Sequence, residues 1–172
     1  MPRRRSLEIA IDGEESILIN PKQTSLLVAL LDAKAEFAVV GGIAVIAHGY
    51  VRATSDIDLF IRPTLENALL VLNALRSLEY PVSGLEPGDL LLDYDNIRFG
   101  PRENHVDILP SIGEMSFDQV WRNRVEAKVG NLLVPFISKA DLIQNKLQVG
   151  RLRDLADAEE LSALDDDPFP QL

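Results

Sequence analysis

The chain has 172 residues, of which 47% are hydrophobic, 27 are acidic, 17 are basic and none is cysteine. A chain of this length and apolar content is predicted to enclose one core as a single globular domain. The composition excludes a disulfide scaffold and a thiolate metal site, and the apolar runs are too short for a membrane span. The first residues lead into Ser6-Leu7-Glu8 rather than into the core of a signal peptide, so we expect a cytoplasmic protein.

The formal net charge of −10 argues against a protein that coats DNA or RNA, because neutralising phosphates needs a positive field over much of one surface. The charge is unevenly distributed, however. Between residues 122 and 153, seven basic residues stand against two acidic ones: Arg122, Arg124, Lys128, Lys139, Lys146, Arg151 and Arg153 against Glu126 and Asp141. This segment can face a polyanion, or its cations can lie on solvated helix faces and a strand edge.

Hydrophobic periodicity and turn residues predict the elements in chain order. The first half is predicted to contain a hairpin or edge extension over 6–20, a helix over 21–35, a strand over 37–40, a helix over 43–48, a strand over 56–62 and a helix over 65–78. A loop rich in proline and glycine follows. The second half is predicted to contain strands over 90–99, with a break near Asp93, and over 105–109, a helix over 117–124, a hairpin over 125–136, and helices over 139–149 and 152–164.

Helices interleaved with strands in this way are typical of a mixed α/β or α+β domain. We expect three parts along the chain. Residues 1–20 form an N-terminal hairpin or extension, residues 21–164 form the domain, and residues 165–172 form an acidic tail that frays.

Two carboxylates begin the strand predicted over 56–62. Because strand side chains alternate between faces, Asp56 and Asp58 point the same way while the reverse face is apolar. Like charges placed side by side repel, and a hard cation such as Mg²⁺ removes that penalty. Asp107, flanked by two aliphatic residues on another predicted strand, can supply a third ligand for a two-ion site. Solvent-facing acids on an edge strand are the alternative explanation.

Gly41 and Gly42 follow a predicted buried strand and open a helix. Backbone N–H groups at a helix N-terminus can hold phosphate oxygens, and the absence of side chains permits close approach. A tight turn that allows the helix to pack is the alternative. No Walker A, Gly-x-Gly-x-x-Gly or Gly-x-Ser-x-Gly sequence occurs, so the P-loop, Rossmann and α/β-hydrolase interpretations lack their basic signals.

Lys146 shares the apolar stripe of its predicted helix with Leu142 and Ile143, so it must either extend to solvent or meet an anion. Asp154 and Asp157 lie in the first turns of the next helix, where the helix dipole and pairing of Arg153 with Asp157 explain them structurally. Arg52 can reach a phosphate or brace its loop.

Two histidines and one tryptophan are weaker candidates. His48 and His105 do not form a metal-binding pair by spacing, and both are interpreted as packing or loop residues. Trp121, beside Arg122 and Arg124, can stack a base, but a single tryptophan on a helix is usually a core residue.

Taken together, these motifs resemble the nucleotidyltransferase superfamily of the DNA polymerase β type. The resemblance consists of Val40-Gly41-Gly42, thirteen intervening residues, Asp56-Ile57-Asp58-Leu59, and a later Val106-Asp107-Ile108. Arg52-Ala53-Thr54-Ser55 is similar to the lead-in of small bacterial and archaeal members. Residues 139–161, with Lys146, Gly150-Arg151 and Asp154-Leu155-Ala156-Asp157, resemble the AbiEii-like type IV toxin nucleotidyltransferases.

The resemblance implies a nucleotidyltransferase fold, a mixed central sheet flanked by helices with a short C-terminal helical appendage. It also implies transfer of an NMP from an NTP to a hydroxyl of RNA or protein, with Mg²⁺ or Mn²⁺ as cofactor and release of pyrophosphate. The chain would then be the toxin of a toxin–antitoxin pair, with a cognate antitoxin as partner.

Carried over to this sequence, the resemblance assigns metal binding and catalysis to Asp56, Asp58 and Asp107, with Asp107 also helping to deprotonate the acceptor. It assigns nucleotide binding to Gly41, Gly42, Arg52, Thr54, Ser55 and Lys146, and makes Asp154 a further, weaker candidate. The alternatives are a noncatalytic regulatory protein that keeps the fold and binds a nucleotide or a protein, and an enzyme that modifies a small molecule.

Overall fold

In the computed structural model of the chain, residues 6–8, 19–92, 97–102 and 104–165 are described. Their strands form a seven-stranded mixed sheet in the order β1-β6-β7-β2-β3-β5-β4. The strands are β1 (Ser6–Glu8), β2 (Phe37–Val40), β3 (Ile57–Ile61), β4 (Ile97–Phe99), β5 (Val106–Leu109), β6 (Val125–Val129) and β7 (Leu132–Phe136). The helices are α1 (Pro21–Asp32), α2 (Gly41–Ala47), α3 (Leu65–Ser77), the 3₁₀ helix η1 (Pro87–Leu91), α4 (Phe117–Asn123), α5 (Lys139–Val149) and α6 (Leu152–Ala163).

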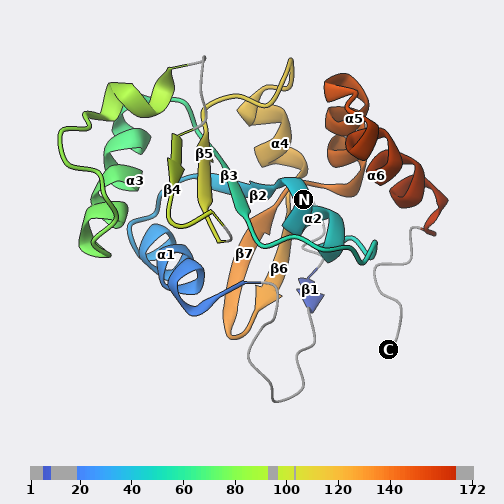
Figure 1. Cartoon of the computed structure of the whole chain (residues 1–172), viewed down its shortest axis with the longest axis horizontal. Helices are drawn as coiled ribbons and strands as arrows, with labels where there is room; N and C mark the ends of the chain where they lie inside the picture. The colour runs from blue at the N-terminus through green and yellow to red at the C-terminus, as the bar shows by residue number, and fades with distance from the viewer. Residues whose placement is uncertain (1–5, 9–18, 93–96, 103, 166–172) are drawn as a thin grey trace.

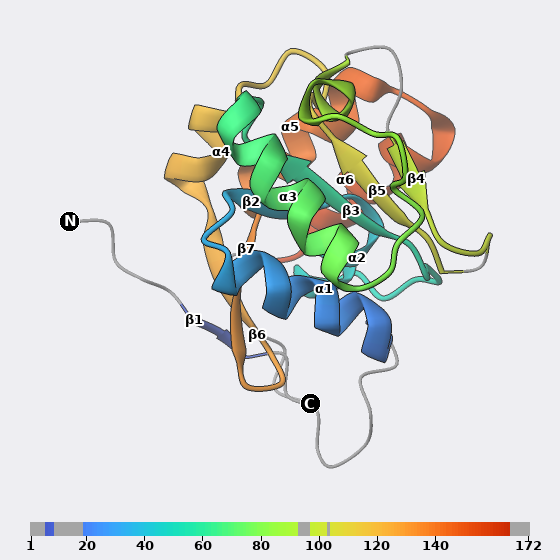
Figure 2. The ribbon, with the colours of Figure 1, turned by 90° about the vertical axis from the view of Figure 1, so that its left-hand side faces the viewer.

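Helices cover both faces of the sheet (Figures 1 and 2). Figure 2 shows α1 and α3 in front of the strands and α5 with α6 beyond them. The middle of the sheet is correspondingly apolar, and all four residues of β2 are buried. A strand that is covered on both faces reads as a continuous hydrophobic run, which is how Phe37-Ala38-Val39-Val40 appears in the sequence.

Most predicted elements are confirmed to within a few residues at their ends. The helix predicted over 139–149 has those bounds because Ser138 caps its first turn and Gly150, in the left-handed conformation, ends it. The hairpin predicted over 125–136 is present as β6 and β7, paired antiparallel around a turn at Gly130 and Asn131.

The strand predicted over 90–99 is wrong in its first part. Residues 87–91 form the 3₁₀ helix η1, with Pro87 at its start. The Glu86 backbone N–H donates to an Asp89 carboxylate oxygen over 2.8 Å, which caps this short helix locally. Only Ile97–Phe99 is a strand, β4. The expectations for residues 9–18 and for most of the tail lie outside the described residues.

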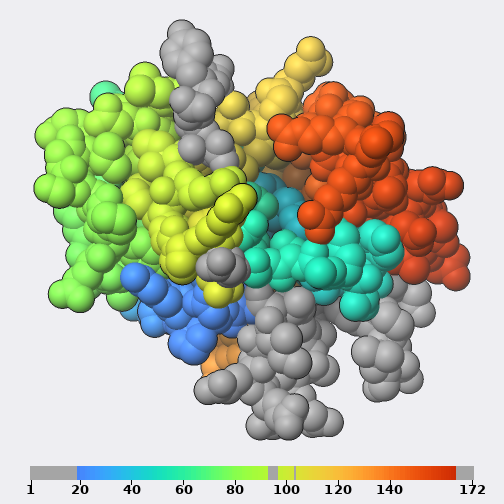
Figure 3. Space-filling model, viewed as in Figure 1, coloured from blue at the N-terminus to red at the C-terminus, as the bar shows by residue number. Residues whose placement is uncertain are grey.

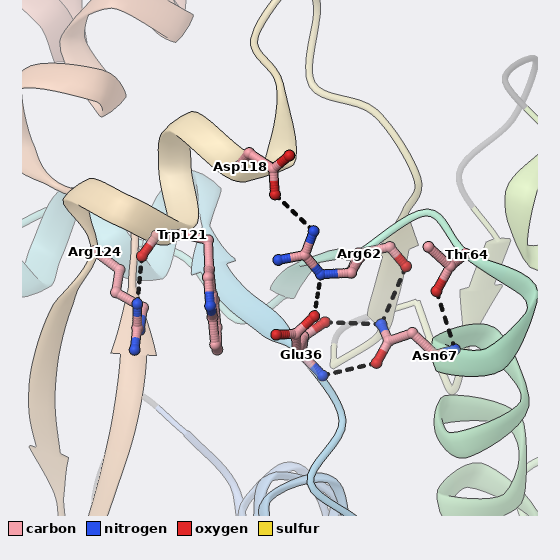
Figure 4. Close-up of polar contacts among 7 residues, drawn as sticks. All are labelled: Glu36, Arg62, Thr64, Asn67, Asp118, Trp121 and Arg124. Carbon is pink, nitrogen blue, oxygen red and sulfur yellow. Dashed lines mark hydrogen bonds and ion pairs between the residues drawn. The ribbon is translucent and has the colours of Figure 1, made fainter.

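The C-terminal end of β3 is fixed by a polar network on the next residue, Arg62 (Figure 4). Its guanidinium pairs with Glu36 and with Asp118, the latter over 2.6 Å. Asn67 of α3 donates to the carbonyls of Glu36 and Arg62 and accepts from the Glu36 backbone N–H. With this end of β3 held against β2 and α3, the position of its other end, which carries Asp56 and Asp58, is also defined.

In the described part of the chain, none of the helices combines the length and apolar character needed to pass through a bilayer.

Candidate active site

Asp58 and Asp107 are direct neighbours across two parallel strands. In the register of β3 with β5, Asp58 lies opposite Asp107, and Ile57 lies opposite Val106. Paired residues of neighbouring strands project to the same face, about 4.8 Å apart at the backbone. Asp56 immediately precedes β3 and lies one alternation away from Asp58. The sheet therefore brings the three carboxylates predicted from the sequence into one neighbourhood.

The elements that carry these residues border a hollow in the surface. Figure 3 shows it between the β4–β5 edge and the α5–α6 pair, with atoms of the β2–α2 region at its floor. Asp56 is the more accessible carboxylate, with its side chain 36% exposed, whereas the Asp107 side chain is 6% exposed. A ligand would therefore meet Asp56 first and Asp107 last.

Asp58 is the carboxylate of the site whose pKa is clearly raised. Burial raises the pKa of its carboxyl from 3.8 to about 6, and the negative charges of Asp107 and Asp56 add to this effect. The positive charges of Lys146 and His105 act in the opposite direction but do not cancel it. Because ionising this carboxyl is unfavourable, a bound cation would lower the free energy of its charged form.

Gly41 is required by the position of the Asp58 carboxylate. Its φ of +66° lies in the left-handed region, and a Cβ built on it would lie 2.0 Å from Asp58 Oδ2. The next residue, Gly42, is packed against the preceding loop, since a Cβ there would lie 2.7 Å from Thr54 Oγ1. The two glycines thus let the start of α2 approach the carboxylate and the loop closely, which the sequence alone explained by phosphate binding or by a tight turn.

Asp107 is paired with Arg98, a residue that sequence reasoning missed. The Arg98 Nε and one terminal nitrogen donate to the two carboxylate oxygens over 2.8 and 2.9 Å. The pair results from strand register, because Arg98 of β4 lies opposite Asp107 of β5. The hydrogen bonds to Asp107 raise the pKa of Arg98 above its ordinary value, and the charges of Asp56 and Asp58 contribute further.

His105 is the second residue that the sequence did not assign to the site. Its Nε2 lies 3.2 Å from Asp56 Oδ2 and 3.7 Å from Asp107 Oδ2, so the ring sits between two of the three carboxylates. Its side chain is buried, and Nδ1 lies 3.3 Å from the Arg102 carbonyl. The interpretation of His105 as a packing residue is therefore incomplete, since it also contacts the acidic cluster.

These contacts affect how the carboxylates can bind an ion. Across the described residues, no three His, Asp or Glu side chains are arranged as ligands around one cation. Arg98 uses both oxygens of Asp107, and His105 contacts Asp56. The donor set nevertheless fits Mg²⁺ or Mn²⁺, because hard divalent cations prefer carboxylate oxygens and Asp58 is repelled by both of its acidic neighbours.

Lys146 meets two anions within the chain. Its Nζ lies 2.7 Å from Asp154 Oδ1 and 3.0 Å from Asp157 Oδ2, and the residue is buried. Sequence reasoning foresaw the choice between solvent and an anion but not these partners. The pairing expected between Arg153 and Asp157 is wrong. Arg153 instead donates to the Ala53 carbonyl over 2.7 Å.

Arg52 braces its loop against α6. Its guanidinium donates to Asp157 Oδ2 over 2.9 Å, and its Nε lies 2.7 Å from Asp157 Oδ1 without the alignment of a hydrogen bond. Asp157, which is 1% exposed, therefore holds Arg52 and Lys146 together. Ser55, just before Asp56, is fixed separately, because its carbonyl accepts from the buried Gln23 side chain of α1 over 3.0 Å.

Two other predicted candidates are partly buried and have partners within the chain. Trp121 stacks on Phe117, with ring centroids 5.6 Å apart, and the Arg124 guanidinium lies over the Trp121 ring, 3.9 Å from its centroid. His48 Nε2 lies 2.8 Å from the Ile137 carbonyl, and burial lowers the pKa of this imidazole. Both residues thus have structural partners, as the sequence-based interpretation expected.

Comparison with known proteins identifies the fold. No protein-family model matches the sequence, and no curated protein sequence matches it either. Among solved structures, the chain is similar to the crystal structure of the lincosamide antibiotic adenylyltransferase LnuA bound to lincomycin. The two chains are 16% identical and align with a TM-score of 0.57 over 86% of this chain and 99% of LnuA.

At this level of identity the likeness shows a shared fold. The chain therefore has a nucleotidyltransferase fold, which confirms the fold class predicted from the glycine pair and the aspartates. The AbiEii-like subgroup, the acceptor and the roles of the individual site residues stay predictions.

Proposed function

We propose that the protein is a metal-dependent nucleotidyltransferase that moves an NMP from an NTP to an acceptor hydroxyl. In this reaction the acceptor oxygen forms a bond to the α-phosphorus, the bond from that phosphorus to the bridging oxygen breaks, and pyrophosphate leaves. The hydroxyl proton passes to a carboxylate of the site or to water.

The observation that carries the proposal is the pairing of Asp58 with Asp107 on β3 and β5, with Asp56 one alternation away. These acids occupy a nucleotidyltransferase fold and stand against a glycine that leaves room for the Asp58 carboxylate. An accidental pair of surface acids would not include a buried carboxylate, such as Asp107, beside two other acids, because that arrangement raises the free energy of the charged form.

In the proposed enzyme, Asp56, Asp58 and Asp107 hold Mg²⁺ or Mn²⁺. The bound ions would neutralise charge on the triphosphate and on the departing pyrophosphate. Asp58, whose pKa is about 6, is largely ionised at neutral pH and available as a ligand. Asp107 is the carboxylate that we assign to help deprotonate the acceptor.

Nucleotide phosphates are proposed to lie beside the start of α2 and the loop before β3. The backbone N–H groups of Gly41 and Gly42, together with Thr54 and Ser55, supply hydrogen-bond donors there. Lys146 adds positive charge that acts on Asp58, which supports a location close to the carboxylates. Arg52 and Asp154 would then act mainly through the ion pairs that position Lys146 and the loop.

The test is transfer of label from NTPs that carry it on the α-phosphate, in the presence of Mg²⁺. Acceptors are total tRNA, cell protein, and a panel of small hydroxyl compounds that includes lincosamides. The α-label should appear on an acceptor and γ-label should appear only in pyrophosphate. The Asp56→Asn/Asp58→Asn double variant and EDTA should abolish transfer, whereas Glu159→Gln, on the exposed face of α6, should not. Nucleotide binding without transfer to any acceptor class would favour the noncatalytic regulatory alternative.

We further propose that the acceptor is a hydroxyl of RNA or protein and that the chain is the toxin of a toxin–antitoxin pair, on the resemblance of residues 139–161 to AbiEii-like proteins. LnuA is a lincosamide antibiotic adenylyltransferase, so small-molecule transfer is the competing assignment. Induced expression of the wild type should arrest growth of a bacterial host, and the double aspartate variant should not. Normal growth together with labelling of a small compound would reject the toxin assignment and retain the enzyme.

A further inference from the structure

Arg98 pairs with Asp107, one of the carboxylates that would bind the metal ion in the proposed function. The pair is bidentate, so both Asp107 oxygens are engaged by one guanidinium. The two side chains differ greatly in their exposure to solvent. The Asp107 side chain is 6% exposed and fixed in β5, whereas the Arg98 side chain is 56% exposed and stands on β4, the last strand of the sheet order.

This difference determines which partner can move. A long arginine side chain that is more than half exposed can leave its partner at little packing cost, but a buried aspartate cannot follow it. An unpaired buried carboxylate is costly, so Asp107 needs a positive partner at all times. His105 Nε2, 3.7 Å from Asp107 Oδ2, lies beyond hydrogen-bonding distance, so Arg98 or a metal ion is the close partner, and each repels the other because both are positive.

Arg98 is also well placed with respect to a polyphosphate. Arginine binds phosphate and carboxylate with the same planar fork, so the group that pairs with Asp107 can pair with phosphate oxygens without any change in its chemistry. Arg98 lies on β4, whose edge with β5 borders the hollow in the surface.

We infer that Arg98 is an exchangeable counter-ion of Asp107: it neutralises this carboxylate when no cation is bound, gives way to a divalent cation, and then pairs with the nucleotide triphosphate. The inference rests on the proposed function, which supplies the metal and the triphosphate. It adds a residue that would couple their binding, so that the metal and the nucleotide favour one another.

The variant Arg98→Gln tests the exchange through two equilibria measured without turnover. Mn²⁺ binding in the absence of nucleotide, followed by electron paramagnetic resonance of the free ion, should tighten by about threefold to tenfold because one positive charge has been removed from the site. Binding of a nonhydrolysable ATP analogue at saturating Mn²⁺ should weaken by a similar factor. Arg76→Gln, which removes the same charge from α3, should leave both affinities at the wild-type values.

A double-variant comparison separates occupation of Asp107 from a general effect of charge. In an Asp107→Asn background, Arg98→Gln should no longer change Mn²⁺ affinity, because the carboxylate for which the two cations compete is gone. The wild type also gives a direct signal. The Nε–H resonance of Arg98, assigned by its loss in Arg98→Gln, should shift when Mg²⁺ is added and shift again with the nucleotide analogue.

The outcomes are distinct. Opposite changes in Mn²⁺ and nucleotide affinity support the exchange, whereas unchanged Mn²⁺ affinity, or weakening of both affinities, overturns it. An equal gain in the Asp107→Asn background also overturns it. Failure of the wild type and Arg98→Gln to bind Mn²⁺ at millimolar concentration would remove the metal-dependent function itself, and with it the inference. Mn²⁺ binding that needs Asp58 but is insensitive to Arg98 would overturn the inference alone.

Discussion

Replacing Asp58 with asparagine should stabilise the folded protein at neutral pH. The neutral amide has nearly the same shape as the carboxyl but carries no charge to desolvate or to be repelled by Asp107 and Asp56. The pKa of Asp58 rises from 3.8 to about 6 on folding, and each pH unit corresponds to 1.36 kcal/mol. The charged form therefore costs about 3 kcal/mol above pH 6, and the variant should recover most of it.

The pH dependence has a definite sign. A carboxyl whose pKa is raised on folding binds more protons in the folded state than in the unfolded state between pH 3.8 and 6. Stability from this group is therefore lost as the pH rises through that window, and the loss is complete above it. The advantage of Asp58→Asn should be about 3 kcal/mol at pH 7.5, about half of that at pH 5, and small near pH 4.

Urea unfolding followed by circular dichroism at these pH values measures the advantage. Glu159→Gln is the matched control, since it removes one carboxylate from an exposed helix position and should change stability by less than about 0.5 kcal/mol. Millimolar Mg²⁺ should stabilise the wild type more than the variant, because the ion relieves the same repulsion. An Asp58→Asn protein that is less stable than the wild type at pH 7.5, or whose advantage is independent of pH, would refute the electrostatic account of the site.

Three further outcomes are expected. Gly41→Ala should lose at least about 2 kcal/mol of folding free energy and all transfer activity, because its Cβ would meet Asp58 Oδ2. The control Gly130→Ala has a similar φ but open space around it, so chemical denaturation should show a loss of about 1 kcal/mol. Asp157→Asn should destabilise by about 3 kcal/mol, because Arg52 loses its carboxylate partner and the buried Lys146 keeps only Asp154. Asp118→Asn, at a 71% exposed side chain, should cost under about 1 kcal/mol, and thermal melts would compare the two variants. EDTA should lower the melting temperature of metal-loaded wild type but not that of Asp58→Asn, and equal lowering in both would place the metal elsewhere.

Much of the fold could be predicted because its signals are local. Helix α5 begins after a serine cap and ends at a glycine, and β2 reads as an unbroken apolar run. The part that failed, residues 90–91, was also a local matter, since a proline and a capping pair formed a short 3₁₀ helix where apolar residues had suggested a strand. A short apolar run fits either state, so the residues that flank it have to decide between them.

The candidate site also combines features that are local in the sequence with contacts between distant segments. The alternation of Asp56 and Asp58 and the glycine pair are short-range patterns, and the sequence alone indicated a phosphate-handling site with carboxylates. The partners of these residues could not be predicted. Arg98 meets Asp107 only because β4 and β5 pair in one register, and a shift by one residue would turn the arginine to the opposite face.

The sequence by itself therefore determined the types of residue in the site, their spacing and the kind of fold that carries them, because these depend on neighbours along the chain. Tertiary structure alone decided which charges meet. Arg52 and Asp157 are 105 positions apart, and Asp58 faces Asp107 across two strands. Such contacts follow from the packing of whole elements around a shared core, and that packing also raises the pKa of Asp58 and leaves Arg98 as the partner of Asp107.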